Sequence, residues 1–174
     1  MRKSVLFVAA LAACALAAGA CHSARSQGGP ERAAGSGAEG GASRAFMTKI
    51  AKEPGVVVLP SGLAYKIVKS GPTSGVAPKT GDEVKVNYEG TLTDGTVFDS
   101  SYKTGEPVVF PVGSLIPGWN EALTLMKPGD VWILYVPPVL GYGPEGKGPI
   151  PPDSVMVFKL ELLGVLPQGG PAMG

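Results

Sequence analysis

Two stretches of the chain, 84–89 and 156–162, place an apolar side chain at every second position. This period of two is typical of a β-strand that buries one face. A third stretch, 63–68, follows the same alternation, and 131–136 is apolar at nearly every position, as expected of a central strand. Thr93-Asp94-Gly95-Thr96 reads as a tight hairpin turn, since glycine tolerates the positive φ that such a turn requires. A sheet of several strands is therefore the first constraint on the fold.

One segment alone has a clear helical spacing. Trp119, Leu123 and Met126 fall at i, i+4 and i+7, which predicts a helix over 119–126 with one buried face. Pro-Gly pairs precede and follow it. Four or five antiparallel strands half-wrapped around one short helix are an α+β fold, and this is the class that we predict.

The first twenty residues predict an export signal. Arg2 and Lys3 are followed by an uncharged stretch rich in alanine and leucine. Ala18-Gly19-Ala20 fits ordinary signal cleavage, while Cys21 directly after it resembles the lipidated cysteine of a bacterial lipoprotein. Cys14 also matches that pattern but would leave an apolar stub on the mature chain, so we expect lipidation at Cys21, with simple cleavage into the periplasm as the alternative. Either way the protein is expected in the bacterial cell envelope.

Composition divides the rest of the 174-residue chain. Residues 21–44 are rich in Gly, Ala and Ser and are predicted to be a flexible linker. Residues 45–59 are expected to form a short arm, helical at first and then extended, which Pro54-Gly55 interrupts. The domain proper is predicted over 60–166, followed by a flexible tail over 167–174.

Residues 84–158 contain several motifs in a fixed order: VNYEGTLTDGTVFDSS, FPVGSLIPGWNEAL, GYGPEGKGPIPPDS and VMVF. This order resembles the FK506-binding-protein (FKBP) family of peptidyl-prolyl cis-trans isomerases. The AFMTKIAKEPGVVVLPSGLAYKIV junction resembles the macrophage-infectivity-potentiator branch of that family. In that branch a long helical arm dimerises the protein. Here only a couple of turns are expected, so we predict a monomer.

The resemblance implies a site for prolyl isomerisation. Trp119 would be the floor beneath a proline ring, and Tyr142 and the backbone N–H of Ile116 would be donors to substrate carbonyls. Asp99 would be a polar acceptor that orients Tyr88. The remaining pocket residues implied are Phe98, Phe110, Leu115, Ile150, Met156 and Phe158. Taken singly, aromatic residues on strands are usually core; only the ordered combination favours a pocket.

The expected chemistry needs no cofactor and no metal. His22 is the only histidine and lies in the linker, so no metal cluster is expected. GYGPEGKG lacks the hydroxyl residue of a phosphate-binding loop, and the prolines after it preclude the helix such a loop requires. A net charge of +1 without a basic stripe argues against nucleic acid as partner. The expected partners are proline-containing polypeptides and macrolides like FK506 or rapamycin. The alternative is a binding module or holdase chaperone that uses the same site with little turnover.

Overall fold

The computed structural model describes residues 36–168 of the chain. The predicted signal sequence, Cys21, His22 and most of the predicted tail lie outside these residues. None of the helices within 36–168 combines the length and apolar character needed to cross a membrane.

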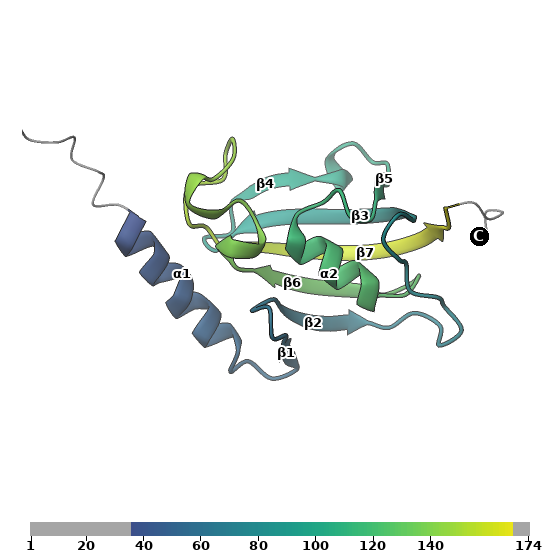
Figure 1. Cartoon of the computed structure of the whole chain (residues 1–174), viewed down its shortest axis with the longest axis horizontal. Helices are drawn as coiled ribbons and strands as arrows, with labels where there is room; N and C mark the ends of the chain where they lie inside the picture. Colours follow the sequence, from purple (N-terminus) through teal and green to yellow (C-terminus); the bar gives the residue numbers. More distant parts are fainter. Residues whose placement is uncertain (1–35, 169–174) are drawn as a thin grey trace, which may run out of the picture. The chain divides into compact units, whose positions relative to one another are not determined.

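The described residues form one antiparallel sheet with a short helix across it (Figure 1). The strands run in the order β1-β2-β6-β7-β3-β4, and β5 also pairs with β3. They are β1 (Val56–Val58), β2 (Ala64–Lys69), β3 (Glu83–Leu92), β4 (Val97–Ser100), β5 (Val108–Pro111), β6 (Val131–Val136) and β7 (Met156–Leu166). The α+β prediction is confirmed, but its count of four or five strands was too low. The strands β1, β4 and β5 have only three or four residues each, too few for a periodic pattern to be recognised.

The alternation predicted for the two longest strands matches their burial. Val84, Val86 and Tyr88 of β3 are buried, and so are the alternate residues of β7 from Met156 to Leu162. The two strands are neighbours, with Val86 opposite Leu162. β6 lies between β2 and β7 and is mostly buried, as expected of a central strand.

Helix α2 (Pro117–Leu125) covers the face of the sheet on which these side chains lie (Figure 1). Trp119, Leu123 and Met126 are all buried, as the spacing predicted. The helix starts at Pro117, two residues before the predicted start. Proline suits a first helical position because its fixed φ is already helical and no N–H bond is lost there.

Helix α1 (Ser36–Ile50) corrects the predicted organisation of the N-terminal part. It begins within the segment predicted to be a linker, nine residues before the predicted helix start at Ala45, and its 15 residues make about four turns. Gly37, Gly40 and Gly41 each disfavour a helix by about 1 kcal/mol relative to alanine, which is why composition indicated a linker. Contacts between α1 and the sheet offset this cost: the ring centroid of Phe46 lies 6.4 Å from that of Tyr135 in β6.

The predicted arm over 45–59 is likewise more tightly joined to the domain than expected. Its extended part contains β1, which pairs with β2 from Val56 opposite Lys66 to Val58 opposite Ala64. The sheet therefore begins before residue 60, where the domain boundary was predicted.

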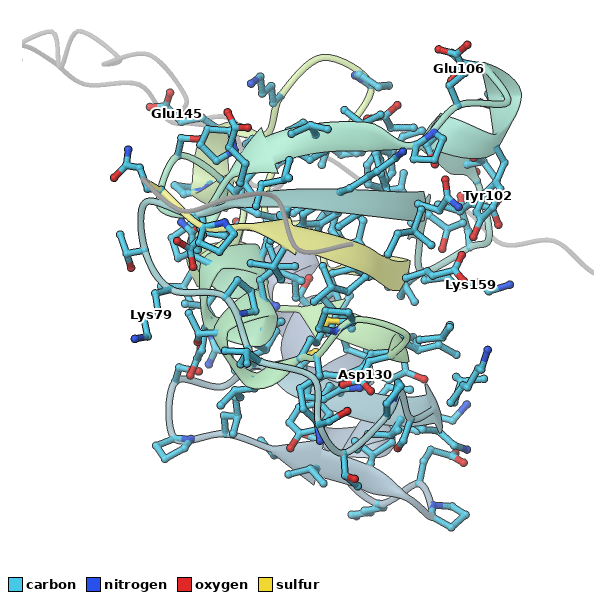
Figure 2. The ribbon with its side chains drawn as sticks, turned by 90° about the vertical axis from the view of Figure 1, so that its right-hand side faces the viewer. Lys79, Tyr102, Glu106, Asp130, Glu145 and Lys159 are labelled. Atoms are coloured by element: carbon cyan, nitrogen blue, oxygen red, sulfur yellow. The ribbon has the colours of Figure 1, made fainter. Side chains whose placement is uncertain are left out.

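One carboxylate, directly before β6, is buried and joins two loops by hydrogen bonds. Asp130 has 3% of its surface exposed and accepts hydrogen bonds from the N–H groups of Gly71 (2.6 Å) and Lys127 (2.9 Å). Figure 2 shows Asp130 among packed side chains, whereas Lys79, Glu106 and Glu145 extend outward. Because both oxygens have N–H donors, the carboxylate links the loop after β2 to the turn before β6.

Candidate active site

Trp119 of α2 lies at the centre of a cluster of aromatic rings drawn from five elements. Its ring centroid lies 5.1 Å from that of Tyr88 in β3, 5.2 Å from Phe158 in β7 and 5.9 Å from Phe110 in β5. All three contacts are edge-to-face, with interplanar angles of 82–84°. Phe98 in β4 extends the cluster through a perpendicular contact with Phe158 at 5.6 Å. This geometry is the favourable one for aromatic pairs, because a positive ring edge meets a negative face.

The cluster is buried at its base and reaches the surface at its rim. Trp119, Phe158 and Tyr88 expose 4%, 5% and 9% of their surface. The half-buried residues that pack against this base are Phe98, Phe110, Leu115, Ile116 and Tyr142. The structure therefore brings together the side chains that the sequence grouped as one site, and the outer ones are only half-buried.

Asp99 joins the cluster through a hydrogen bond. The Tyr88 hydroxyl donates to Asp99 Oδ2 at 2.7 Å, and the N–H of Ser100 donates to Asp99 Oδ1 at 2.9 Å. Burial raises the pKa of Tyr88 well above its ordinary value, and the hydrogen bond to Asp99 and its charge raise it further. Tyr88 is thus held protonated and oriented, while Asp99 is itself exposed at the edge of the aromatic rings.

Two donors at the rim have no acceptor within residues 36–168. The carbonyl of Ile116 accepts from the N–H groups of Trp119 (3.0 Å) and Asn120 (3.1 Å), but the N–H of Ile116 donates to no group there. The hydroxyl of Tyr142 is also without a protein partner in this part of the chain, and Lys147 Nζ lies 5.1 Å from its ring centroid. Both donors can therefore serve a bound ligand.

Ile150 and Met156 lie deeper than the sequence suggested. Ile150, expected to cover the site, exposes 7% of its surface and packs into the core. Met156, expected to close its back, is fully buried. A Cβ on Gly141 would lie 2.3 Å from the Met156 terminal methyl, so Met156 packs tightly beneath the segment that leads into Tyr142. These two side chains support the site from below.

Three positioning residues were missed by the sequence analysis. Gly90 of β3 has no side chain where Phe98 and Phe158 meet: a Cβ there would lie 2.7 Å from Phe98 and 2.8 Å from Phe158. Ser101 is buried, and its hydroxyl accepts from the Tyr88 N–H at 2.9 Å. Asn120 donates to the Leu115 carbonyl at 2.8 Å and so braces the loop before α2. Of these three residues, only Gly90 could have been recognised from the sequence, because a glycine inside a strand pattern indicates that other groups approach the backbone closely.

Within the described residues no three His, Cys, Asp or Glu side chains gather in a way that could hold a metal ion. The groups gathered at this site are aromatic rings, apolar side chains, hydrogen-bond donors and the Asp99 carboxylate.

Known proteins resemble this chain in sequence and in fold. Residues 75–163 match the family described as FKBP-type peptidyl-prolyl cis-trans isomerase, and residues 17–67 match the domain amino-terminal to it. The chain is 53% identical over 124 residues to peptidyl-prolyl cis-trans isomerase Mip of Coxiella burnetii, covering 71% of this chain and 53% of that protein. It is 48% identical over 122 residues to the FKBP-type 22 kDa isomerase of Escherichia coli, covering 70% and 58%. The chain spans about half the length of the curated relatives it matches.

Two solved structures show the same fold. The crystal structure of FkpA from Escherichia coli matches with a TM-score of 0.72 and 45% identity, over 76% of this chain and 61% of that one. The crystal structure of a peptidyl-prolyl cis-trans isomerase from Pseudomonas syringae pv. tomato matches with a TM-score of 0.71 and 36% identity, over 77% and 98%. The fold, the matched motifs and these identities show that the chain belongs to the FKBP-type peptidyl-prolyl cis-trans isomerase family.

Proposed function

We propose that the protein is a peptidyl-prolyl cis-trans isomerase that assists the folding of exported proteins. One observation carries this proposal: a buried Trp119 surrounded by aromatic rings, with two unused donors, the Ile116 N–H and the Tyr142 hydroxyl, at its rim. Family membership supports it.

The reaction needs differential binding rather than bond cleavage. Rotation about an X–Pro bond faces a barrier of about 18–20 kcal/mol, because it breaks the conjugation of the amide. In the twisted state the carbonyl is less polarised, so an apolar site favours that state over the planar amide, which loses good hydration on entry. For about every 1.36 kcal/mol by which the site binds the twisted state more favourably than the planar amide, the rate increases about tenfold.

Each group then has a role that needs no acid, base or nucleophile. The face of Trp119 receives the proline ring, and Phe98, Phe110 and Phe158 keep water from it. The Ile116 N–H and the Tyr142 hydroxyl bind substrate carbonyls in the orientation that rotation produces. Asp99 accepts the hydrogen bond of the Tyr88 hydroxyl and so fixes the orientation of the Tyr88 ring beside the proline.

Location and assembly are also proposals. A relative from Legionella longbeachae is named an outer membrane protein, and the N-terminal sequence of this chain supports export with lipidation at Cys21. Mass spectrometry of the mature N-terminus distinguishes a diacylated Cys21 from simple cleavage. A monomer, and binding of FK506-like macrolides at the aromatic cluster, complete the proposal; light scattering and calorimetric titration test them.

A protease-coupled assay on a short prolyl peptide tests the function. The wild-type protein should accelerate the cis-to-trans step, and Asp99→Ala should lower kcat/KM by about tenfold, the equivalent of about 1.36 kcal/mol. Asp82→Ala is the matched control, because the half-buried Asp82 carboxylate accepts from the N–H groups of Lys79 and Gln168 and from none of the site residues. Saturable peptide binding without acceleration would instead show a binding module. Full activity in a folded Asp99→Ala variant would refute the site.

A further inference from the structure

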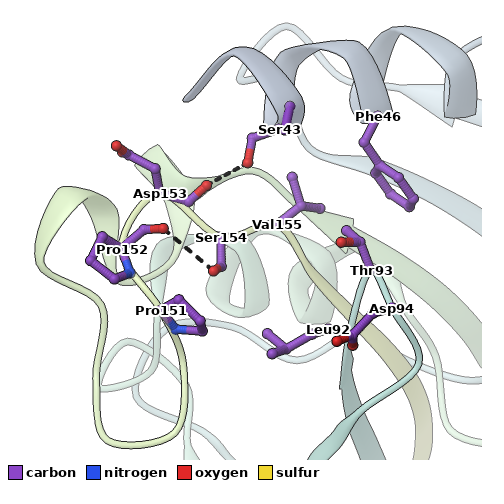
Figure 3. A pocket seen from close by; sticks show the side chains of 11 residues that line it. Ser43, Phe46, Leu92, Thr93, Asp94, Pro151, Pro152, Asp153, Ser154 and Val155 are labelled. Atoms are coloured by element: carbon purple, nitrogen blue, oxygen red, sulfur yellow. Dashed lines mark hydrogen bonds between the residues drawn. The ribbon is translucent and has the colours of Figure 1, made fainter. Parts of the chain in front are cut away.

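The loop between β6 and β7, residues 137–155, carries Tyr142. It contains two short 3-10 turns, η2 (Pro138–Leu140) and η3 (Gly143–Glu145), and a backbone bridge between Lys147 and Ile150. Its other hydrogen bonds are internal. Within residues 36–168, one hydrogen bond alone joins this loop to another element: the Ser43 hydroxyl of α1 donates to the Asp153 carbonyl (Figure 3).

Asp153 connects the Ser43 contact with the segment that contains Tyr142. Its N–H donates to the carbonyl of Gly143 at 2.9 Å, directly after Tyr142 in the sequence. Its φ of 51° is the only positive value of a non-glycine residue in the described part of the chain. Such a conformation is uncommon and depends on the contacts that hold it. Both backbone groups of Asp153 are thus engaged, one by α1 and one by the Tyr142 segment.

The contact between α1 and the loop is narrow. Two cavities lie beside it, of about 400 Å³ and about 470 Å³, and Ser43 and Asp153 line both. Figure 3 shows Ser43 reaching down to Asp153 from the helix, with Phe46 on the other side of the first cavity. The contact therefore has open space on both sides. Within residues 36–168, the Ser43 hydroxyl supplies the hydrogen bond between α1 and the loop.

We propose that Ser43 is a positioning residue for the isomerase site: through Asp153 and Gly143, it holds the loop that presents the Tyr142 hydroxyl. Helix α1 is then part of the catalytic unit. This inference rests on the proposed function, because Tyr142 acts there as a donor to the substrate.

Isomerase kinetics of the Ser43→Ala variant of the 174-residue chain test the inference. Alanine favours a helix, so the variant should fold. Loss of one hydrogen bond of ordinary strength should lower kcat/KM about three- to fivefold, and Ser43→Thr, which keeps a hydroxyl, should restore most of it. Thr48→Ala is the matched control, because the Thr48 hydroxyl donates to Arg44 within the same helix. It should leave kcat/KM unchanged.

Two further measurements show whether the effect passes through Tyr142. In a double-mutant cycle, Ser43→Ala should add nothing to Tyr142→Phe, since coupled residues are not additive. Backbone amide hydrogen exchange in residues 143–154 should be faster in Ser43→Ala than in the wild type. Without the bond from Ser43 to the Asp153 carbonyl, the Asp153 N–H is held less firmly against the Gly143 carbonyl.

The possible failures are distinct. An inactive wild-type protein would overturn the proposed function, while exchange of residues 143–154 still reports on the link to α1. An active wild type with unchanged kinetics or unchanged exchange in Ser43→Ala would overturn this inference alone. An equal effect of Ser43→Ala in the Tyr142→Phe background would also overturn it, because Ser43 would then act elsewhere.

Discussion

The Tyr88 hydroxyl donates to Asp99 Oδ2 at 2.7 Å, and this bond joins a buried ring to a carboxylate exposed at the surface. β3 and β4 are neighbours in the sheet, with Gly90 opposite Asp99, so the pairing of two strands sets the separation of the two groups. The bond keeps the one hydroxyl at the base of the aromatic cluster satisfied.

Titration of Tyr88 tests this relationship. Burial and Asp99 raise the pKa of Tyr88 above the ordinary 10.0. The difference in ultraviolet absorbance between wild type and Tyr88→Phe should show this tyrosine ionising later than the others as the pH rises. In Asp99→Ala the pKa should fall but stay elevated, since burial is the larger cause. Ionisation of Tyr88 at or below pH 10 would contradict the buried, hydrogen-bonded geometry.

The same pKa predicts how stability varies at high pH. Between the ordinary value and the raised one, the folded protein keeps a proton that the unfolded chain has lost. The stability that Tyr88 contributes is therefore fully present below pH 10 and decreases as the pH rises towards its folded pKa. Urea unfolding of wild type and Tyr88→Phe between pH 9 and 11 should show a steeper loss in the wild type.

Gly90→Ala tests the close approach of rings over β3. An added Cβ would lie 2.7 Å from Phe98 and 2.8 Å from Phe158. Overpacking of this kind costs about 1–3 kcal/mol, and the displaced rings should lower isomerase activity as well. The matched control is Gly164→Ala in β7, where a Cβ would meet nothing within 4 Å. Equal stability and activity in the two variants, by urea unfolding and the peptide assay, would show that Gly90 is not a packing site.

Asp130→Ala tests whether the stability of the fold can fall without a change in activity at the candidate site. The change leaves the N–H groups of Gly71 and Lys127 without their acceptor, and an unsatisfied buried donor costs about 1–3 kcal/mol. The hydrogen bonds of the Asp130 carboxylate go to the loop after β2 and to the turn before β6, and not to a residue of the aromatic cluster. The melting temperature should fall, while kcat/KM of the folded protein stays at the wild-type value. A matching fall in activity well below the melting temperature would contradict this separation.

Truncation of Trp119 measures what the cluster contributes to the core. Phe/Trp→Ala changes cost about 3–5 kcal/mol, and Trp119 contacts three rings, so Trp119→Ala should fall in this range. Trp119→Phe should lose much less stability, because the Trp119 indole N–H has no hydrogen-bond partner in the described residues. Chemical unfolding compares the two variants. A greater loss from Trp119→Phe than from Trp119→Ala would contradict the packing described here.

Strong local patterns made much of the fold predictable. β3 and β7 alternate because one face of each meets α2, and α2 shows its three buried residues at helical spacing. The turn after Leu92 was also predictable: Gly95 has a φ of 87° and its N–H donates to the Leu92 carbonyl at 3.0 Å. In the strands and the helix, the sequence signal and the tertiary contact depend on the same side chains, while in the turn the signal is the backbone freedom of glycine.

The parts that were missed depend on contacts between distant segments. Helix α1 contains three glycines, and only its neighbours in the folded domain, such as Tyr135 beside Phe46, compensate for them. Ile67 follows the alternation of β2 but is exposed, and the register with β6 shifts directly after it, between Ile67 and Lys69. The link from Ser43 to Asp153 spans 110 positions in the sequence, and no local pattern indicates it.

Exchange spectroscopy by NMR on a prolyl peptide, without any protease, is the most direct measurement of the central claim. With a catalytic amount of the protein, cis and trans signals of the peptide should exchange within the mixing time, and Asp99→Ala should slow this exchange about tenfold. Chemical shifts of Trp119 that move on peptide addition, with cis and trans signals that do not exchange, would show binding without isomerisation and would contradict the proposed function.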